Sequence, residues 1–145
     1  MKNSMKLEFS AIGQNEALAR SCISAFALQL DPSIDQLIEI KTAVSEAVTN
    51  AVVHAYKDEV GIIKIKANIK NNSLHIQVSD KGCGISDVCK AMEPFYTTAF
   101  EYERSGMGFC VMESFMDKVS VVSTPGKGTT VKLIKMIGVK NEPKQ

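Results

Sequence analysis

A carboxylate and an amide stand one helical turn apart in a segment that is otherwise mostly alanine and valine. Glu46 and Asn50 are spaced i, i+4, and His54 follows at i+8. Helical geometry places such residues on one face. The amide could serve Mg²⁺, which prefers oxygen ligands and keeps several waters, and Glu46 could accept a proton from an attacking hydroxyl. The alternative interpretation is a solvated helix face, with His54 adding a favourable charge at the helix end.

A second acidic residue ends a strand-like segment and enters a glycine turn. Asp80 is followed by Gly82 and Gly84. A carboxylate in this position can accept a hydrogen bond from an exocyclic amine such as that of adenine. The glycines allow the backbone to approach a flat ring closely. The alternative is an ordinary Asp-Gly loop.

Two further glycines stand before a short helical segment. Gly106 and Gly108 leave free backbone N–H groups at a helix start, and such groups bind phosphate. Arg104 precedes them and could meet a terminal phosphate. A simple helix start with a surface arginine is the alternative. The sequence contains neither a P-loop pattern nor the His-Arg-Asp and Asp-Phe-Gly loops of protein kinases, which excludes both nucleotide-binding schemes.

A pair of hydroxyl side chains opens the last strand-like segment, directly after Gly128. Thr129 and Thr130 taken alone are ordinary strand formers. Together, the four motifs supply a helix-borne acid and amide, an acid in a glycine turn, a glycine-rich helix start and a distal hydroxyl. That combination indicates a site for a nucleotide and its metal ion.

Length and composition favour one globular domain. The chain has 145 residues, with 45% hydrophobic and 23% charged residues, which suits a single domain with a sizeable core. The net charge of +1 argues against a broad electrostatic contact with nucleic acid, although it leaves a local patch possible. No segment approaches the roughly 20 apolar residues that a membrane span needs, and the N-terminus lacks an apolar signal core. We expect a cytoplasmic protein with no membrane and no direct nucleic-acid contact.

The cysteines predict free thiols. Cys22, Cys83, Cys89 and Cys110 form no Cys-x-x-Cys pair, and the chain has only two histidines, so a structural zinc site is disfavoured. A reducing cytosol keeps such thiols reduced. Cys83 lies inside the glycine turn, where a redox switch is the remote alternative.

Periodicity predicts the elements that must position these residues. Residues 5–10 alternate between apolar and polar, as a strand with one buried face does. Asn15 could cap a helix that ends near residue 30, and the segment 31–33 should begin a second helix that ends near residue 55. Residues 63–69 and 74–78 read as a hairpin with Asn71 and Asn72 in its turn.

The second half of the chain predicts three more elements and a long connector. Residues 86–92 could form a short helix, and 93–105 resemble the irregular connectors that often act as lids. A helix over 109–116 and strands over 118–123 and 129–137 follow. Residues 138–145 read as a polar tail. The expected architecture is one domain over 1–137, a two-layer α+β sandwich whose mainly antiparallel sheet is covered by helices on one face.

The motifs in this order resemble the ATP-binding domain shared by gyrase, the heat-shock chaperone of that fold, histidine kinases and mismatch-repair ATPases. Within that superfamily, the chain is similar to the sporulation anti-sigma-F factors, which are small serine kinases. The matching stretches are residues 39–42, 44–51, 103–109 and 116–117, together with the first strand and residues 30–32. The resemblance therefore extends over essentially the whole chain and implies the Bergerat-type ATP-binding fold.

The resemblance also implies roles for individual residues. Glu46 would be the general base for a serine hydroxyl, Asn50 would hold Mg²⁺, and Arg104 would reach the γ-phosphate. Arg20 matches a position that contacts partner proteins. Residues 93–105 would form the nucleotide lid. The implied nucleotide contacts are Asn50, Asp80, Gly82, Gly84, Thr97, Thr98, Arg104, Ser105, Gly106, Met107, Gly108, Phe109, Thr129 and Thr130.

The implied activity has two parts. As a homodimer with ATP, the protein would hold sporulation sigma factor F, and it would transfer the γ-phosphate to a serine of the anti-anti-sigma factor. Catalysis would depend on positioning and on charge neutralisation by Mg²⁺ and Arg104. Two alternatives stay open at this point. One is a stress-response-type anti-sigma kinase that acts on another sigma factor, and the other is a nucleotide-dependent sigma-binding module without kinase activity.

Overall fold

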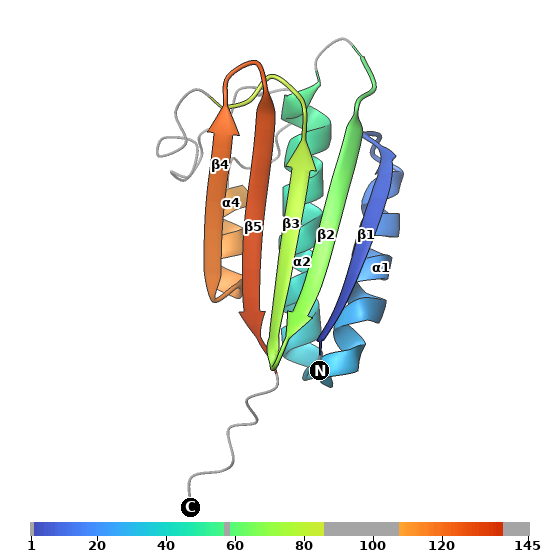
Figure 1. Cartoon of the computed structure of the whole chain (residues 1–145), viewed down its shortest axis with the longest axis vertical. Coiled ribbons are helices and arrows are strands. Elements are labelled where there is room, and N and C mark those ends of the chain that lie inside the picture. Colours follow the sequence, from blue (N-terminus) through green and yellow to red (C-terminus); the bar gives the residue numbers. More distant parts are fainter. Residues whose placement is uncertain (1, 57–58, 86–107, 138–145) are drawn as a thin grey trace, which may run out of the picture.

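The computed structural model describes residues 2–56, 59–85 and 108–137. Five strands form one antiparallel sheet in the order β1-β2-β3-β5-β4, and the helices lie against one of its faces (Figure 1). This arrangement confirms the predicted two-layer α+β sandwich. The strands are β1 (Lys2–Ser10), β2 (Ile62–Lys70), β3 (Ser73–Asp80), β4 (Lys118–Thr124) and β5 (Gly128–Met136). The helices are α1 (Asn15–Ala27), α2 (Ile34–Asn50) and α4 (Gly108–Phe115), with a 3₁₀ turn η1 (Leu28–Leu30) and a π turn η2 (Ala51–Ala55).

The two long helices begin in different ways. The prediction that Asn15 caps α1 is wrong, because the helix already begins at Asn15 and Gln14 before it makes no side-chain cap. The Asn15 side chain instead donates to Ser10 O at 2.9 Å and ties α1 to the end of β1. At α2, Ser33 Oγ accepts from Gln36 N at 3.1 Å, and the Gln36 side chain accepts from Ser33 N at 3.0 Å. This capping box satisfies backbone N–H groups that the helix cannot pair and confirms the predicted start.

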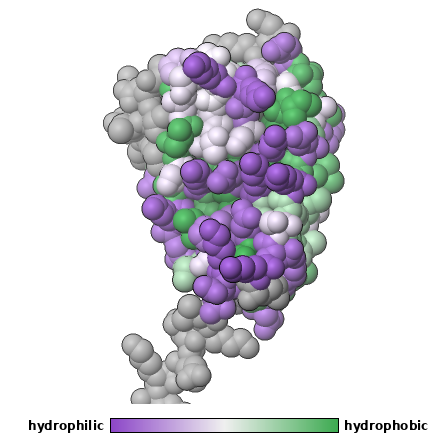
Figure 2. All heavy atoms as spheres, in the orientation of Figure 1, coloured by the Kyte–Doolittle hydropathy of each residue, from purple (hydrophilic) through white to green (hydrophobic). Residues whose placement is uncertain are grey.

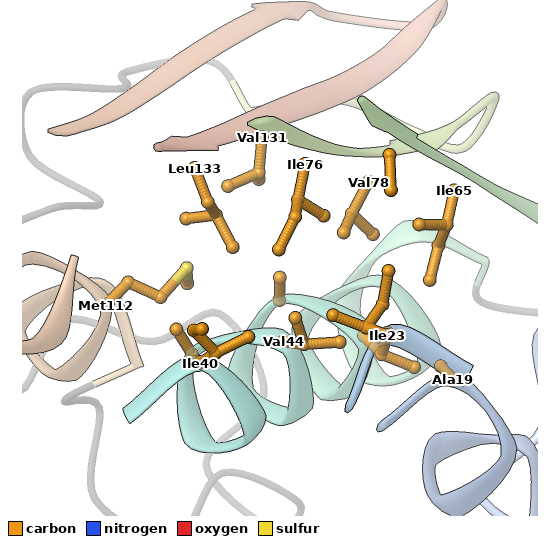
Figure 3. Close-up of a cluster of buried hydrophobic side chains, with 14 of the residues drawn as sticks. Ala19, Ile23, Ile40, Val44, Ile65, Ile76, Val78, Met112, Val131 and Leu133 are labelled. Carbon is orange, nitrogen blue, oxygen red and sulfur yellow. The ribbon is translucent and has the colours of Figure 1, made fainter. Parts of the chain in front are cut away.

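Strict alternation in the strands builds the core. In β2 the side chains at 63, 65, 67 and 69 are buried, and those at 62, 64, 66 and 70 are exposed. Asn71 has φ 54° in the β2–β3 turn, as its position predicts. Figure 3 shows the two layers meeting, with Ile40 and Val44 of α2 and Met112 of α4 facing strand residues such as Ile76 and Leu133.

One buried charge fixes α2, α4 and β5 to one another. Lys135 lies on the inner face of β5 and is only 8% exposed. Its Nζ donates to Phe115 O at the end of α4 and lies 3.5 Å from Glu39 Oε2 on α2. Because a buried ammonium must be paired, this contact holds both helices at a fixed distance from the sheet.

Several predictions concern residues that the structure does not describe. They are the short helix at 86–92, the lid at 93–105 and the tail at 138–145, so the domain limits stay predictions. Within the described part of the chain, no helix is long and apolar enough to cross a membrane.

Candidate functional site

The start of α4 lies directly against the acid and the amide of α2. A methyl group placed on Gly108 would come within 3.0 Å of Asn50 Nδ2 and 3.3 Å of Glu46 Oε2. The absence of a side chain therefore allows the helix end to sit beside both groups. The first N–H groups of a helix have no intrahelical partner and favour anions. The tertiary structure thus brings three sequence-predicted residues, Glu46, Asn50 and Gly108, into one place.

The donor set at this point fits a magnesium ion shared with phosphate. Asn50 offers an amide oxygen next to a helix end that favours negative charge, and the Glu46 carboxylate lies one turn away. Within the described residues, no three His, Cys, Asp or Glu side chains gather as an all-protein metal cage. Mg²⁺ is usually bound in this sparse way, by one or two side chains together with phosphate oxygens and water.

Glu46, Asn50 and His54 were predicted to lie on one helix face, but His54 does not follow the other two. After Asn50 the helix widens into the π turn η2, whose hydrogen bonds span five residues instead of four. The α-helical spacing that would stack His54 below Asn50 is therefore lost. The π turn instead supports the glycine turn, because Cys83 N donates to Ala55 O at 2.8 Å and Cys83 Sγ donates to His54 O at 3.1 Å.

The glycines of this turn are required by close packing. A methyl group on Gly82 would lie 2.2 Å from Ala55 O, and Gly84 has φ 75° and lies against the backbone of Thr124. Tyr56 adds a further support, since its hydroxyl accepts from Lys81 N at 2.9 Å and donates to Ile62 O at 2.8 Å. The turn is therefore a fixed surface that the π turn and the β4–β5 hairpin hold from two sides.

Asp80 ends β3 at the edge of this surface. Its Oδ1 accepts from Gly82 N at 2.9 Å. Burial raises the pKa of Asp80, and backbone hydrogen bonds from Gly82 and Thr129 oppose that rise without cancelling it. The carboxylate is thus partly removed from water, which strengthens any hydrogen bond that it accepts from a bound amine.

The two threonines of β5 face opposite sides of the sheet. Thr129 is the cross-strand partner of Asp80 and of Ser123, and its Oγ1 lies 2.7 Å from Ser123 Oγ. Thr130 pairs with Ser79, with the two hydroxyl oxygens 3.1 Å apart. Because successive strand residues alternate between faces, only the side chain of Thr129 shares a face with Asp80. Thr130 is not brought to this cluster.

Two supporting residues were not among the predicted site residues, although Gly128 stands in the sequence motif directly before the two threonines. Gly128 has φ 122°, and a methyl group there would lie 2.1 Å from Asp80 O, so β5 can approach Asp80 only with glycine at this position. Ser123 Oγ accepts from Ile85 N at 2.7 Å and contacts Thr129. The hairpin formed by the last two strands could have identified Ser123, because its register places Ser123 opposite Thr129.

The remaining predicted site residues divide into two groups. Phe109 is 9% exposed and packs in the core, so its backbone alone can face the site. The other group lies outside the described residues, and its assignments stay predictions. It consists of Thr97, Thr98, Arg104, Ser105, Gly106 and Met107.

A groove of about 720 Å³ is lined by residues of α1, α2 and η2 and is called the α1–α2 groove below. Arg20 lies on its α1 side, where it pairs with Glu16 at 3.1 Å and stays 40% exposed. Ser45 Oγ, also in its wall, is buried without a hydrogen-bond partner in the described part of the chain. The groove is lined by Gly13, Glu16, Arg20, Ile38, Lys41, Thr42, Ser45, Glu46, Thr49, Val52 and Val53.

Asp80→Asn should weaken adenine nucleotide binding about tenfold to a hundredfold, which is the usual effect of losing a hydrogen bond to a charged group. In the unsubstituted protein, ADP affinity should also fall as pH drops toward the Asp80 pKa, which lies above the ordinary 3.8, because a protonated carboxyl is uncharged and is a weaker hydrogen-bond acceptor. Calorimetric titration from pH 7 to pH 5 would check both effects.

The Asp80→Asn variant also serves as the control for the pH experiment on the unsubstituted protein. Its ADP affinity should lack the part of the pH dependence that comes from Asp80. Any titration of the ADP phosphates affects both proteins equally. Because burial of the charged form costs stability at neutral pH, the variant should not unfold more easily. Identical pH profiles for the two proteins would show that Asp80 does not contact the nucleotide.

Known proteins resemble the chain in both sequence and fold. A family profile described as the histidine kinase-like ATPase domain matches residues 9–135. An anti-sigma F factor of Caldanaerobacter subterraneus is 56% identical over 136 residues, which cover 94% of this chain and 95% of that protein. The anti-sigma F factor of Bacillus subtilis is 50% identical over 136 residues, with 93% of each chain covered.

Solved structures with little sequence identity share the fold. The RsbU and RsbW domains of a Mycobacterium tuberculosis protein superpose with a TM-score of 0.69 at 18% identity, over 93% of this chain and 32% of that one. The catalytic domain of the histidine kinase ThkA gives a TM-score of 0.58 at 16% identity, over 92% and 96% of the two chains. At these identities the likeness concerns the fold alone.

Proposed function

Because the chain belongs to the anti-sigma F factor family of the histidine kinase-like ATPase domains, we propose that it is an ATP-dependent anti-sigma factor and protein-serine kinase. It would hold sporulation sigma factor F and transfer the γ-phosphate of ATP to a serine of the anti-anti-sigma factor. A cytoplasmic homodimer with Mg²⁺ is part of this proposal.

The position of Glu46 carries the proposal. Its carboxylate stands beside Gly108, where the helix end favours phosphate, and the same residue lines the α1–α2 groove that contains Arg20. A protein segment lying in the groove would therefore meet the carboxylate from one side while a triphosphate approaches from the other. A base beside the acceptor hydroxyl, close to the phosphate site but leaving the acceptor oxygen a direct approach to phosphorus, is the arrangement that base-assisted phosphoryl transfer uses.

Each described residue then has a defined part in the reaction. Glu46 takes the proton of the serine hydroxyl as the serine oxygen bonds to phosphorus and the bond to the ADP oxygen breaks. The N–H groups at the start of α4 hold phosphate oxygens, and the amide oxygen of Asn50 lies beside them. Mg²⁺ at Asn50 would supply charge neutralisation on the phosphates. Arg104, outside the described residues, is assigned to the γ-phosphate.

The other end of the nucleotide is assigned to the Asp80 cluster. Asp80 and Thr129 lie at neighbouring strand ends on the helix-covered face. The carboxylate can accept from the exocyclic amine of adenine, and the Thr129 hydroxyl, held by Ser123, can contact the ring. A guanine base presents a carbonyl at the position of that amine, so the cluster should discriminate against GTP.

A transfer assay tests the proposal directly. Purified protein with γ-labelled ATP, Mg²⁺ and the anti-anti-sigma factor should produce labelled phosphoserine, and GTP should be a poor donor. ATP binding together with sigma-factor binding but without any transfer would reduce the protein to a nucleotide-dependent binding module. Preferential capture of a different sigma factor would instead indicate the stress-response type.

Arg20→Glu should weaken binding of the sigma factor by about tenfold or more, since it removes a half-exposed cation from the groove and places a carboxylate beside Glu16. Nucleotide affinity should be unchanged, because Arg20 is absent from the Glu46–Asn50–Gly108 cluster. Pull-down titrations and ADP calorimetry measure the two quantities. Lys118→Glu, with the same charge change on β4, is the matched control. Equal weakening of both ligands by Arg20→Glu would indicate misfolding and not a partner contact.

A further inference from the structure

The face of the sheet that the helices leave uncovered is crowded with lysines. Figure 2 looks onto this face and shows mostly hydrophilic side chains there. The only carboxylate among the outward-facing residues of the five strands is Glu8, which pairs with Lys64 at 3.2 Å. Six exposed lysines on β1, β2 and β5 define what is called the lysine face below: Lys2, Lys6, Lys64, Lys66, Lys70 and Lys132.

The register of the sheet sets these charges close together. Lys6 is directly opposite Lys66, and Lys2 is directly opposite Lys70. Like charges in such cross-strand pairs destabilise a sheet. His75 on β3 lies beside this array: burial lowers its pKa, and the charge of Lys70 lowers it further. The folded protein therefore maintains a repulsive array that a bound anion would relieve.

Two ordinary explanations account for the lysine face only in part. Lysines on an edge strand prevent unwanted strand pairing, which covers the lysines of β1 but not those of the interior strands β2 and β5. Solubility is served by mixed charges, whereas here the signs are segregated. The chain as a whole has a net charge of only +1, so the remainder of the molecule is net negative. The whole-chain value, which led us to expect no nucleic-acid contact, averages over this asymmetry.

We propose that the lysine face binds the phosphate backbone of double-stranded DNA without reading its sequence. Lysines two apart on one strand stand about 6.6 Å apart, and a nine-residue strand spans about 30 Å. At 3.4 Å per base pair, that length corresponds to roughly nine base pairs. A rigid, regularly spaced cationic array matches the regularly spaced charge of a duplex.

The composition of the face favours this ligand over others. No arginine, phenylalanine or tyrosine points outward from the five strands, so neither bidentate base recognition nor stacking on single-stranded bases is available. The strongly exposed apolar side chains Ile62, Val122 and Met136 stand on three different strands and form no wedge that could enter a bilayer. Since the helices and the α1–α2 groove occupy the other layer, DNA and the protein partners could bind together.

Fluorescence anisotropy with a mixed-sequence 20-base-pair duplex tests the proposal. Contacts to five phosphates give a slope of about −4.5 in log K against log[salt], so affinity should fall several hundred-fold, in order of magnitude, between 50 and 200 mM salt. The double variant Lys66→Gln/Lys132→Gln should reduce the slope by about 2. The control Lys41→Gln/Lys127→Gln removes the same charge outside the lysine face and should leave the slope unchanged.

Other results would overturn the assignment. They are no binding at 50 mM salt, an equal loss in the control variant, and preferential binding to phosphatidylserine vesicles. Equally tight binding of polyglutamate would also overturn it, because it would point to an acidic protein as the ligand. A second readout is independent of affinity. Bound DNA neutralises the charge of Lys70, so the pKa of His75, followed by NMR, should rise on saturation with the duplex. An unchanged His75 pKa on saturation would place the DNA elsewhere.

Discussion

Glu46→Gln should lower the rate constant of phosphoryl transfer by about 10²–10⁴, the usual contribution of a general base. The glutamine has nearly the same size and keeps an oxygen beside Gly108, but it cannot take the proton of the serine hydroxyl. The affinity for ADP should stay within about threefold, because a group that acts mainly in the transition state affects rate more than binding. Single-turnover transfer of labelled phosphate and calorimetry with ADP and Mg²⁺ measure the two quantities.

A control on the same helix separates basicity from net charge. Asp35→Asn also removes one carboxylate from α2, in its exposed first turn, and should leave both rate and affinity unchanged. A normal transfer rate for Glu46→Gln would mean that another group accepts the proton. Parallel loss of transfer and ADP binding would make Glu46 part of the nucleotide site and not the base.

Gly128→Ala should destabilise the fold by about 3 kcal/mol or more, because two costs add. The added methyl group would lie 2.1 Å from Asp80 O, and the residue has φ 122°, a conformation that side chains rarely adopt. The structure can relieve the contact only by moving β5 away from β3, which would also separate Thr129 from Asp80. Urea denaturation should show a lower midpoint at an unchanged slope, and ADP affinity should fall as well.

Gly126→Ala in the same turn is the matched control. Gly126 also has positive φ, 77°, but nothing lies within 4 Å of the added methyl group. Its cost should therefore be only the left-handed conformation, about 1 kcal/mol, with ADP affinity preserved. Equal losses in the two variants would show that backbone conformation alone, and not the approach to Asp80, makes glycine necessary at position 128.

Local patterns were sufficient for the elements and for part of the site. Alternation in β2 and β3 predicted a hairpin because only one face of each strand is buried, and Asn71 in its turn followed from the preference for positive φ. Glu46 and Asn50 could be paired from spacing alone because an α-helix fixes the positions of residues four apart. Asp80 was identified in the same way, from a strand end followed by glycines.

Other features required the assembled molecule. The choice between Thr129 and Thr130 depends on register, since a shift of one residue moves a side chain to the other face of the sheet. The π turn that displaces His54 from its predicted row is decided by the packing of η2 against the glycine turn. The net charge of +1 does not reveal the lysine face, because composition cannot show on which side of a sheet the charges lie.

By itself, the sequence determined where strands and helices follow one another along the chain and which chemical groups they carry. Both depend on propensity and periodicity within single segments. Only the tertiary structure decided that Gly108 lies against Glu46 and Asn50, and that the same glutamate borders the groove containing Arg20. Those contacts join segments far apart in the chain. They arise from the packing of α1 and α4 against α2, which no local pattern records.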